Sequence, residues 1–211
     1  MLLSQNSKMR KTGADVNIRL FNFTLPALRS STSLVTCPSA GVCAIGCYAR
    51  MGAYRFSNVA TKHESNLAAS LLSHFVEGIL HDIDKVKASH VRIHDSGDFY
   101  SREYLNKWLT IMQARPNVQF YAYTKQILLF KGLPLPINFT VIYSLGGKYD
   151  SLIDQARHRH SKVFESLEGL VAAGYADASS NDFVALGDNP KIGLVYHGNK
   201  SYSNTNWAKA A

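Results

Sequence analysis

Residues 89–123, SHVRIHDSGDFYSREYLNKWLTIMQARPNVQFYAY, decide the fold class of this chain. The segment begins with one β-rich stretch, residues 89–94, and ends with another, residues 118–123. Between them, Ser101 is a good helix N-cap, and the apolar residues after it recur at helical spacing until Pro116. A strand, a helix and a second strand in this order predict a parallel βα unit.

The same alternation continues on both sides of this segment. Further strands are predicted at residues 18–23, 139–145, 162–164 and 192–196. One long amphipathic helix with a bend at Gly78 is predicted over residues 57–83, and shorter helices over 126–131, 151–157 and 167–173. About six strands are too few for a closed eight-stranded barrel. The expected fold is therefore α/β, with an open, partial parallel (βα)6-like barrel.

Composition predicts an ordinary globular protein. Of the 211 residues, 46% are hydrophobic and 18% charged, which excludes a mostly disordered chain. No apolar run is long enough to span a membrane, and the N-terminus turns polar after three residues. We expect a single domain over residues 1–211, with a polar tail from 201 to 211, located in the cytoplasm and without a membrane partner.

The net charge of +8 indicates polyanionic partners. Such a charge attracts nucleic acid, nucleotides or acidic proteins, although it also serves solubility. The basic residues are scattered along the chain, which argues against a dedicated nucleic-acid-binding arm.

The three cysteines, Cys37, Cys43 and Cys47, all lie in one loop, residues 36–50. An odd, clustered set in a cytosolic chain indicates a metal or an iron–sulfur cluster rather than a disulfide framework. Zinc prefers closer spacing and a fourth ligand, here a histidine, and free thiols are a third possibility. A [4Fe–4S] cluster held by three thiolates is favoured; it leaves one iron open, where S-adenosylmethionine binds in radical enzymes.

Polar residues follow the predicted strands where each strand ends. Ligands of parallel α/β folds bind at the carboxyl ends of strands, so we expect these residues to share one rim with the cysteine loop. The candidates are Ser96, Gly97, Asp98, Thr124, Lys125, Ser144 and His197. For Asp95 and Asp98 the alternative is a turn and a helix cap, and for His197 a structural role or a zinc ligand.

A metal-dependent nuclease is a weaker alternative. His158 and His160 have metal-like spacing but are expected on a solvated surface. His63 and Glu64 lack the second histidine of a zinc protease site. The sequence offers no complete set of base, metal carboxylates and phosphate clamp.

Together these motifs resemble those of the phage-associated gene product 88 domain family, and they are similar to a reduced radical S-adenosylmethionine (radical SAM) enzyme. The matching residues are Cys37-Pro38, Cys43, Cys47-Tyr48-Ala49, RIHDSGDF (92–99), FYAYTK (120–125) and Tyr196-His197-Gly198. The resemblance implies a barrel of the radical SAM type with three thiolates on a [4Fe–4S] cluster. It also implies a glycine–acid motif, here Ser96, Gly97 and Asp98, at the amino group of S-adenosylmethionine.

The expected function is that of an iron–sulfur protein acting on nucleic acid or nucleotides. In such an enzyme, Thr124, Lys125 and Ser144 are expected at the carboxylate or ribose of S-adenosylmethionine. The alternative is a non-catalytic phage-type protein in which a metal only braces the fold. Its basic face would then dock on nucleic acid or on a host protein.

Overall fold

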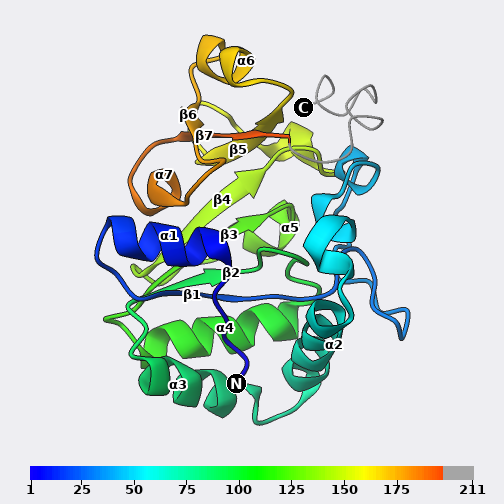
Figure 1. Ribbon diagram of the computed structural model, residues 1–211, viewed down its shortest axis with the longest axis vertical. Helices are drawn as coiled ribbons and strands as arrows, with labels where there is room; N and C mark the ends of the chain where they lie inside the picture. The colour runs from blue at the N-terminus through cyan, green and yellow to red at the C-terminus, as the bar shows by residue number, and fades with distance from the viewer. Residues whose placement is uncertain (197–211) are drawn as a thin grey trace.

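The computed structural model describes residues 1–196, whose strands form one open, curled, all-parallel sheet (Figure 1). The strands are β1 (Leu20–Phe23), β2 (His90–Ile93), β3 (Gln119–Thr124), β4 (Phe139–Ser144), β5 (His160–Phe164), β6 (Ala176–Asp177) and β7 (Lys191–Val195). Their order in the sheet is β1-β2-β3-β4-β5-β7-β6. The sheet makes a half-barrel, so the predicted fold class is confirmed. The two-residue β6 was not predicted, because it is too short to carry an alternating pattern.

The helices are α1 (Ser7–Asp15), α2 (Ser57–Leu71), α3 (Phe75–Val86), α4 (Arg102–Ala114), α5 (Ile127–Phe130), α6 (Leu167–Ala172) and α7 (Phe183–Leu186). Short 3₁₀ turns lie at η1 (Val42–Ala44), η2 (Tyr48–Arg50), η3 (Gly52–Arg55) and η4 (Asp150–Leu152). The predicted N-cap is confirmed, since Ser101 accepts a hydrogen bond from Tyr104 N at 3.1 Å. Only η4 occupies the predicted helix at 151–157. Within residues 1–196, no helix is long and apolar enough to cross a membrane.

The single long helix predicted over residues 57–83 is wrong, because the structure has two helices, α2 and α3. Leu72 between them is extended, with ψ at 156°. Leu71 and Leu72 are 55% and 47% exposed, so the apolar stripe of the sequence is interrupted at the break. Gly78 lies inside α3 and does not bend the chain there. A Cβ at Gly78 would lie 3.2 Å from Leu2 Cδ1, so this glycine allows the N-terminal segment to pack closely.

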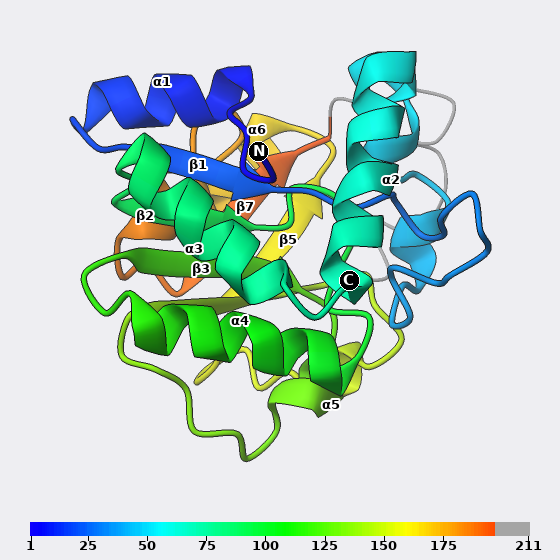
Figure 2. The same ribbon diagram turned by 90° about the horizontal axis from the view of Figure 1, so that it is seen from below.

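The outer face of the sheet packs on helices through an aromatic layer. Phe23 of β1 and Ile93 of β2 point into this layer and are fully buried. Trp108 of α4 meets the Phe23 ring edge-on, with ring centroids 5.4 Å apart. Helices α3 and α4 lie side by side beneath the strands (Figure 2). Burial of this apolar surface is the main source of stability for the fold.

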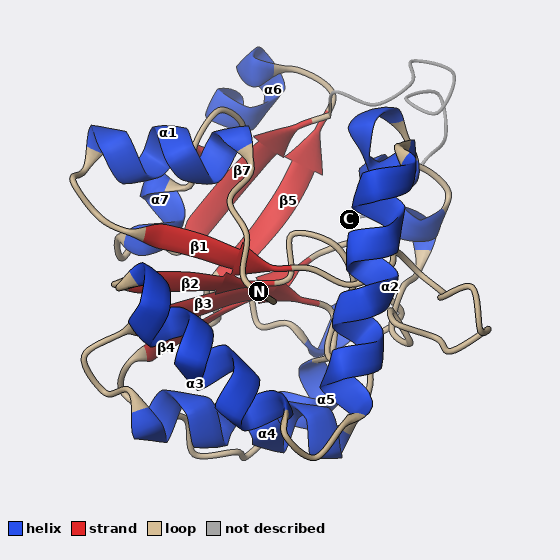
Figure 3. Ribbon diagram, turned by 60° about the horizontal axis from the view of Figure 1, so that its bottom comes forward, coloured by secondary structure: helices blue, strands red, loops and turns tan. Residues whose placement is uncertain are grey.

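The inner, concave face of the half-barrel is covered by α1, which the sequence did not predict. Figure 3 shows α1 on the opposite side of the sheet from α3 and α4. Asn6 caps α1 by accepting a hydrogen bond from Met9 N at 2.9 Å. Met9 is buried in a second core cluster with residues such as Leu20 and Ile192. Lys8 reaches past β1 and donates to the carbonyl of Ala178 at 2.7 Å, so α1 bridges the two sides of the open sheet.

Candidate functional site

A cavity of about 410 Å³ lies at the carboxyl ends of the strands, a volume typical of small-molecule sites. Nine residues predicted for the site line it: Cys37, Cys43, Cys47, Ser96, Gly97, Asp98, Thr124, Lys125 and Ser144. The structure therefore brings all nine together, while their individual roles remain predictions. The predicted His197 and Gly198 lie outside the described residues.

The cysteine loop is docked on the turn that follows β4. Cys43 N donates to Gly146 O at 3.1 Å, and Ala40 pairs with Gly147 in an isolated β-bridge. A Cβ on Gly41 would lie 2.7 Å from the carbonyl carbon of Gly147, so only glycine allows this contact. Two backbone segments about a hundred residues apart thus fix the position of Cys43.

The three thiols are free and half-buried. Leu28 N donates to Cys37 Sγ at 3.3 Å. Burial, with a smaller contribution from Asp98, raises the pKa of Cys37 to about 12, and burial also raises the pKa of Cys47. A thiolate in either position therefore needs a cation beside it.

In the part of the chain that the structure describes, no three His, Cys, Asp or Glu side chains are grouped to hold a metal ion. Zinc requires its ligands around one centre. A [4Fe–4S] cluster differs, because each thiolate binds a different iron and the sulfurs stay farther apart.

The carboxylate of Asp98 joins the ends of β2 and β3. It accepts hydrogen bonds from Thr124 Oγ1 at 2.6 Å, from Phe99 N at 2.8 Å and from Lys125 N at 2.9 Å. Gly97 before it has φ at +82°, and a Cβ there would lie 2.5 Å from Leu25 Cβ. Asp98 lines the cavity, but its hydrogen bonds tie it to the turn, as in the alternative role considered from sequence.

Asp95 and Ser96 present polar atoms that the fold leaves unpaired. Asp95 Oδ2 accepts from Asn6 Nδ2 at 2.8 Å and from Tyr54 OH at 3.3 Å. Asp95 Oδ1 and Ser96 Oγ are buried, and neither has a hydrogen-bond partner among residues 1–196. Buried polar atoms are almost always paired in native proteins, so these two are available to a ligand in the cavity. In the sequence, Asp95 stood in the strand-end motif 92–99, with a turn or a helix cap as its alternative role.

Lys125 and Ser144 link β3 to β4 at the same rim. Lys125 Nζ donates to Ser144 Oγ at 2.6 Å. The lysine therefore places a cation at the cavity wall beside the turn that holds Cys43.

Other residues also line the cavity, and among them are three with no individual role in the sequence analysis: Lys8, Arg92 and Tyr123. Strand alternation was the available signal for two of them, because Arg92 and Tyr123 point inward when Ile93 and Ala122 pack outward. Lys8 lies on the unpredicted helix α1 and had no such signal.

The surface position predicted for His160 is wrong. The residue is fully buried at the start of β5, which lies inside the sheet and pairs with β4 on one side and β7 on the other. Its Nε2 bonds Tyr175 OH at 2.8 Å, and its Nδ1 bonds the carbonyl of His158 at 2.9 Å. The metal-like spacing of the two histidines is thus explained by a structural role for His160.

Comparison with known proteins identifies the family of this chain. Residues 1–208 match the family described as Gene product 88. The "Gene 88 protein" of Mycobacterium phage L5 is 42% identical over 57 residues, and that of Mycobacterium phage D29 is 40% identical over 57 residues. Each alignment covers 26% of this chain and 24% of the relative, so the chain matches about a quarter of their length. No solved structure matches significantly. Because the family match extends over nearly the whole sequence, this phage-type chain belongs to the Gene product 88 family.

Proposed function

We propose that this protein binds a [4Fe–4S] cluster through Cys37, Cys43 and Cys47 and acts as a radical SAM-like enzyme on a nucleotide or nucleic acid. The observation that carries the proposal is the convergence of all three thiols and the strand-end polar residues on one cavity. The donor set fits the cluster. Three free thiols stand in one loop, and burial raises the pKa of two of them, so that a metal is needed to stabilise their thiolates.

S-adenosylmethionine fits the polar groups beside this loop. Asp95 Oδ1 and Ser96 Oγ would bind its amino group, since both are unpaired within residues 1–196. Asp98 acts as a positioning residue, because its carboxylate holds Thr124 and the backbone of Lys125 in place. Lys125 and Ser144 would contact the carboxylate or the ribose.

When bound, the cluster and S-adenosylmethionine supply one-electron chemistry that removes a hydrogen atom from a substrate, with the electron coming from an external reductant. The chain contributes a walled site of limited volume. Such a site protects a reactive species from water and from side reactions. The net charge of +8 favours a nucleotide or a nucleic acid terminus as substrate, in the host cytoplasm.

Iron analysis tests the cluster. Protein reconstituted without oxygen is expected to hold about four iron atoms per chain and, once reduced, to give a low-temperature electron paramagnetic resonance signal. Cys43→Ala is expected to lose most of this iron. Ser166→Ala, which changes a surface helix cap on α6, is the control and keeps it. Full iron content in Cys43→Ala would refute the assignment.

A turnover assay tests the enzyme. Reduced holoprotein incubated with S-adenosylmethionine is expected to release 5′-deoxyadenosine above the level of Cys43→Ala. Asp95→Asn is expected to raise the apparent KM for S-adenosylmethionine while iron content stays constant. Equal release by Cys43→Ala and the unmodified chain would contradict radical chemistry at this site.

The second candidate is a non-catalytic, metal-braced protein that binds nucleic acid. Residues at the end of the cysteine loop and just after it favour this candidate, because Arg50, Arg55 and Phe56 are all exposed there, with Phe56 at 63%. Exposed aromatic and basic side chains together are typical of single-strand binding surfaces. This candidate predicts salt-dependent DNA binding that Arg55→Ala weakens, and no release of 5′-deoxyadenosine.

A further inference from the structure

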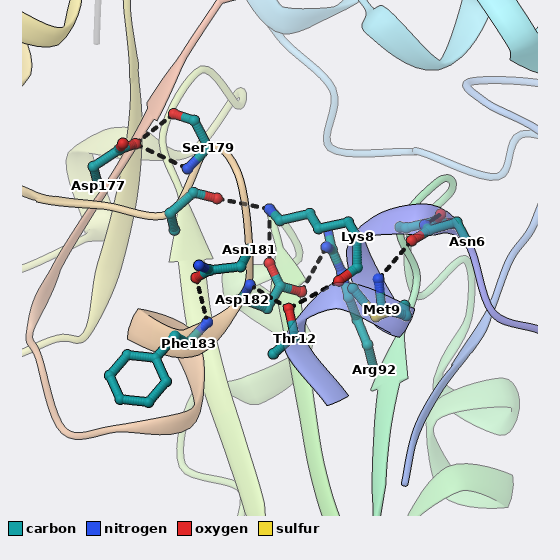
Figure 4. A network of polar contacts seen from close by, with 12 residues as sticks. Asn6, Lys8, Met9, Thr12, Arg92, Asp177, Ser179, Asn181, Asp182 and Phe183 are labelled. Carbon is teal, nitrogen blue, oxygen red and sulfur yellow. Dashed lines mark hydrogen bonds and ion pairs between the residues drawn. The ribbon is translucent and has the colours of Figure 1, made fainter. Parts of the chain in front are cut away.

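A buried ion network around Asp182 includes two cations that line the cavity, Lys8 and Arg92 (Figure 4). Lys8 Nζ, from α1, lies 2.7 Å from Asp182 Oδ1. Arg92 Nη1, from β2, donates to Asp182 Oδ2 at 2.8 Å. Tyr121 OH donates to the same Oδ2 at 2.7 Å. Asp182 is fully buried just before α7, so its carboxylate joins three separate parts of the fold.

This network holds more buried positive than negative charge. Two cations, Lys8 and Arg92, share one buried carboxylate, which leaves one positive charge uncompensated. Asp177 also acts on Lys8, but it is exposed and bonded to Ser179. Burial, and to a lesser extent Arg92, lowers the pKa of Lys8 despite the opposing effect of Asp182. A structural ion group in a protein interior is ordinarily balanced.

Both cations line the cavity, and the groups beside them are unpaired. Arg92 is 8% exposed, and its Nε has no hydrogen-bond partner among the described residues. The guanidinium carbon of Arg92 lies 4.9 Å from the centre of the Tyr123 ring, which fixes its plane. Tyr123 OH is likewise buried and lacks a partner within the described part of the chain. Two free donors thus accompany the excess charge.

We propose that Lys8, Arg92 and Tyr123 form an anion pocket, which binds the carboxylate or phosphate oxygens of a small molecule. An oxyanion supplies what this part of the cavity lacks, namely a negative charge and acceptors for the Arg92 Nε and Tyr123 OH donors. As a substrate site it rests on the proposed function, with the charged end of the substrate held by Lys8 and Arg92. As an anion-binding site, the pocket does not depend on the iron–sulfur cluster.

Matched ligands test the pocket on the full-length protein, with and without reconstituted iron. Thymidine monophosphate and thymidine differ only in the phosphate, and inorganic phosphate and acetate distinguish phosphate from carboxylate. Equilibrium dialysis is expected to give at least tenfold tighter binding of the monophosphate than of thymidine. Phosphate or acetate, whichever anion the pocket prefers, is expected to compete.

Conservative variants locate the binding. Arg92→Lys keeps a cation opposite Asp182 but removes the Nε donor, and Tyr123→Phe removes a hydroxyl that the fold does not use. We expect each to weaken monophosphate binding about five- to tenfold. Arg115→Lys, in the surface pair with Asp84, is the matched control and leaves binding unchanged.

The outcomes separate this inference from the proposed function. If the monophosphate and thymidine bind equally, or if neither variant weakens binding, the anion pocket is refuted. Iron content and 5′-deoxyadenosine release test the proposed function separately. Iron-free protein that still selects the monophosphate supports the pocket, whatever the iron analysis and the turnover assay show for the radical chemistry.

Discussion

The two faces of the sheet are built for different purposes, although the same strands supply both. On the outer face, Ile93 and Ala122 pack into the aromatic layer under α3 and α4. On the inner face, their neighbours Arg92 and Tyr123 line the cavity and keep unpaired polar atoms within the described residues. Side chains alternate along a strand, so a step of one residue separates the stabilising layer from the binding surface. Large stability losses are therefore expected from the outer face, and functional losses without unfolding from the inner face.

The largest expected effect is that of Trp108→Ala in the outer layer. Trp108 is fully buried against Phe23 and Phe75, and truncation leaves a large cavity. We expect a loss of about 4 kcal/mol in the free energy of unfolding, measured in urea. Leu128→Ala, at a position 46% exposed, is the control and changes it by less than about 1 kcal/mol. A loss in Trp108→Ala no larger than in the control would contradict the division between the faces.

On the inner side of the sheet, stability also depends on the buried carboxylate of Asp182. Asp182→Ala leaves Lys8 and Arg92 without a counter-charge. We expect the free energy of unfolding to fall by about 3 kcal/mol. Asp84→Ala removes the carboxylate of the surface pair with Arg115 and should change the urea midpoint little. If the triple variant Asp182→Ala, Arg92→Met, Lys8→Met is no more stable than Asp182→Ala, uncompensated charge is not the cause.

The sequence predicted the outer layer better than the inner one. Alternating strands, such as residues 118–123, and the Ser101 cap are local signals, and both were found. Helix α1 was missed because SKMRKTGAD carries no apolar stripe, and Met9 is its one large buried apolar residue. No glycine or proline lies between α2 and α3 to predict the break at Leu72. The break depends instead on tertiary packing.

The residues of the candidate site were likewise predictable only in part from the sequence. The cysteines and the strand-end residues were recognisable, because loop spacing and strand ends are visible in one sequence. The contact of Lys8 with Asp182 joins residues from opposite ends of the chain and has no local signal. The free oxygen of Asp95 was equally hidden, since only the structure reveals that Asp98, and not Asp95, has its carboxylate fully occupied by the turn.

A smaller effect is expected from the pH dependence of His94, which lies between the two faces. Its burial, and next the charge of Arg92, lower the pKa of His94 to about 3. The unfolded state, with an ordinary pKa near 6.5, binds the proton more readily, so stability falls as the pH drops from about 6.5 towards 3. Between pH 7 and pH 5, His94 is expected to lower the free energy of unfolding by about 2 kcal/mol.

Urea unfolding at both pH values measures this loss. His94→Gln is expected to reduce the pH dependence by about that amount, whereas His81→Gln, on the exposed side of α3, leaves it unchanged. An unaltered pH dependence in His94→Gln would show that the buried neutral imidazole is not its source.

The smallest expected effect compares two buried tyrosines, one from each face. Tyr104 OH bonds His94 Nε2 at 2.8 Å in the outer layer, so Tyr104→Phe leaves a buried ring nitrogen unpaired and should lower the free energy of unfolding by about 1.5 kcal/mol. Tyr123 OH has no hydrogen-bond partner in residues 1–196, so Tyr123→Phe should change it by less than about 0.5 kcal/mol. Urea unfolding of both variants tests the contrast. If Tyr123→Phe destabilises as much as Tyr104→Phe, its hydroxyl serves the fold, and the inner face loses a donor that we assign to a ligand. If Tyr123→Phe destabilises less than Tyr104→Phe, the fold does not need this buried hydroxyl. Binding of a ligand then explains why the hydroxyl is there.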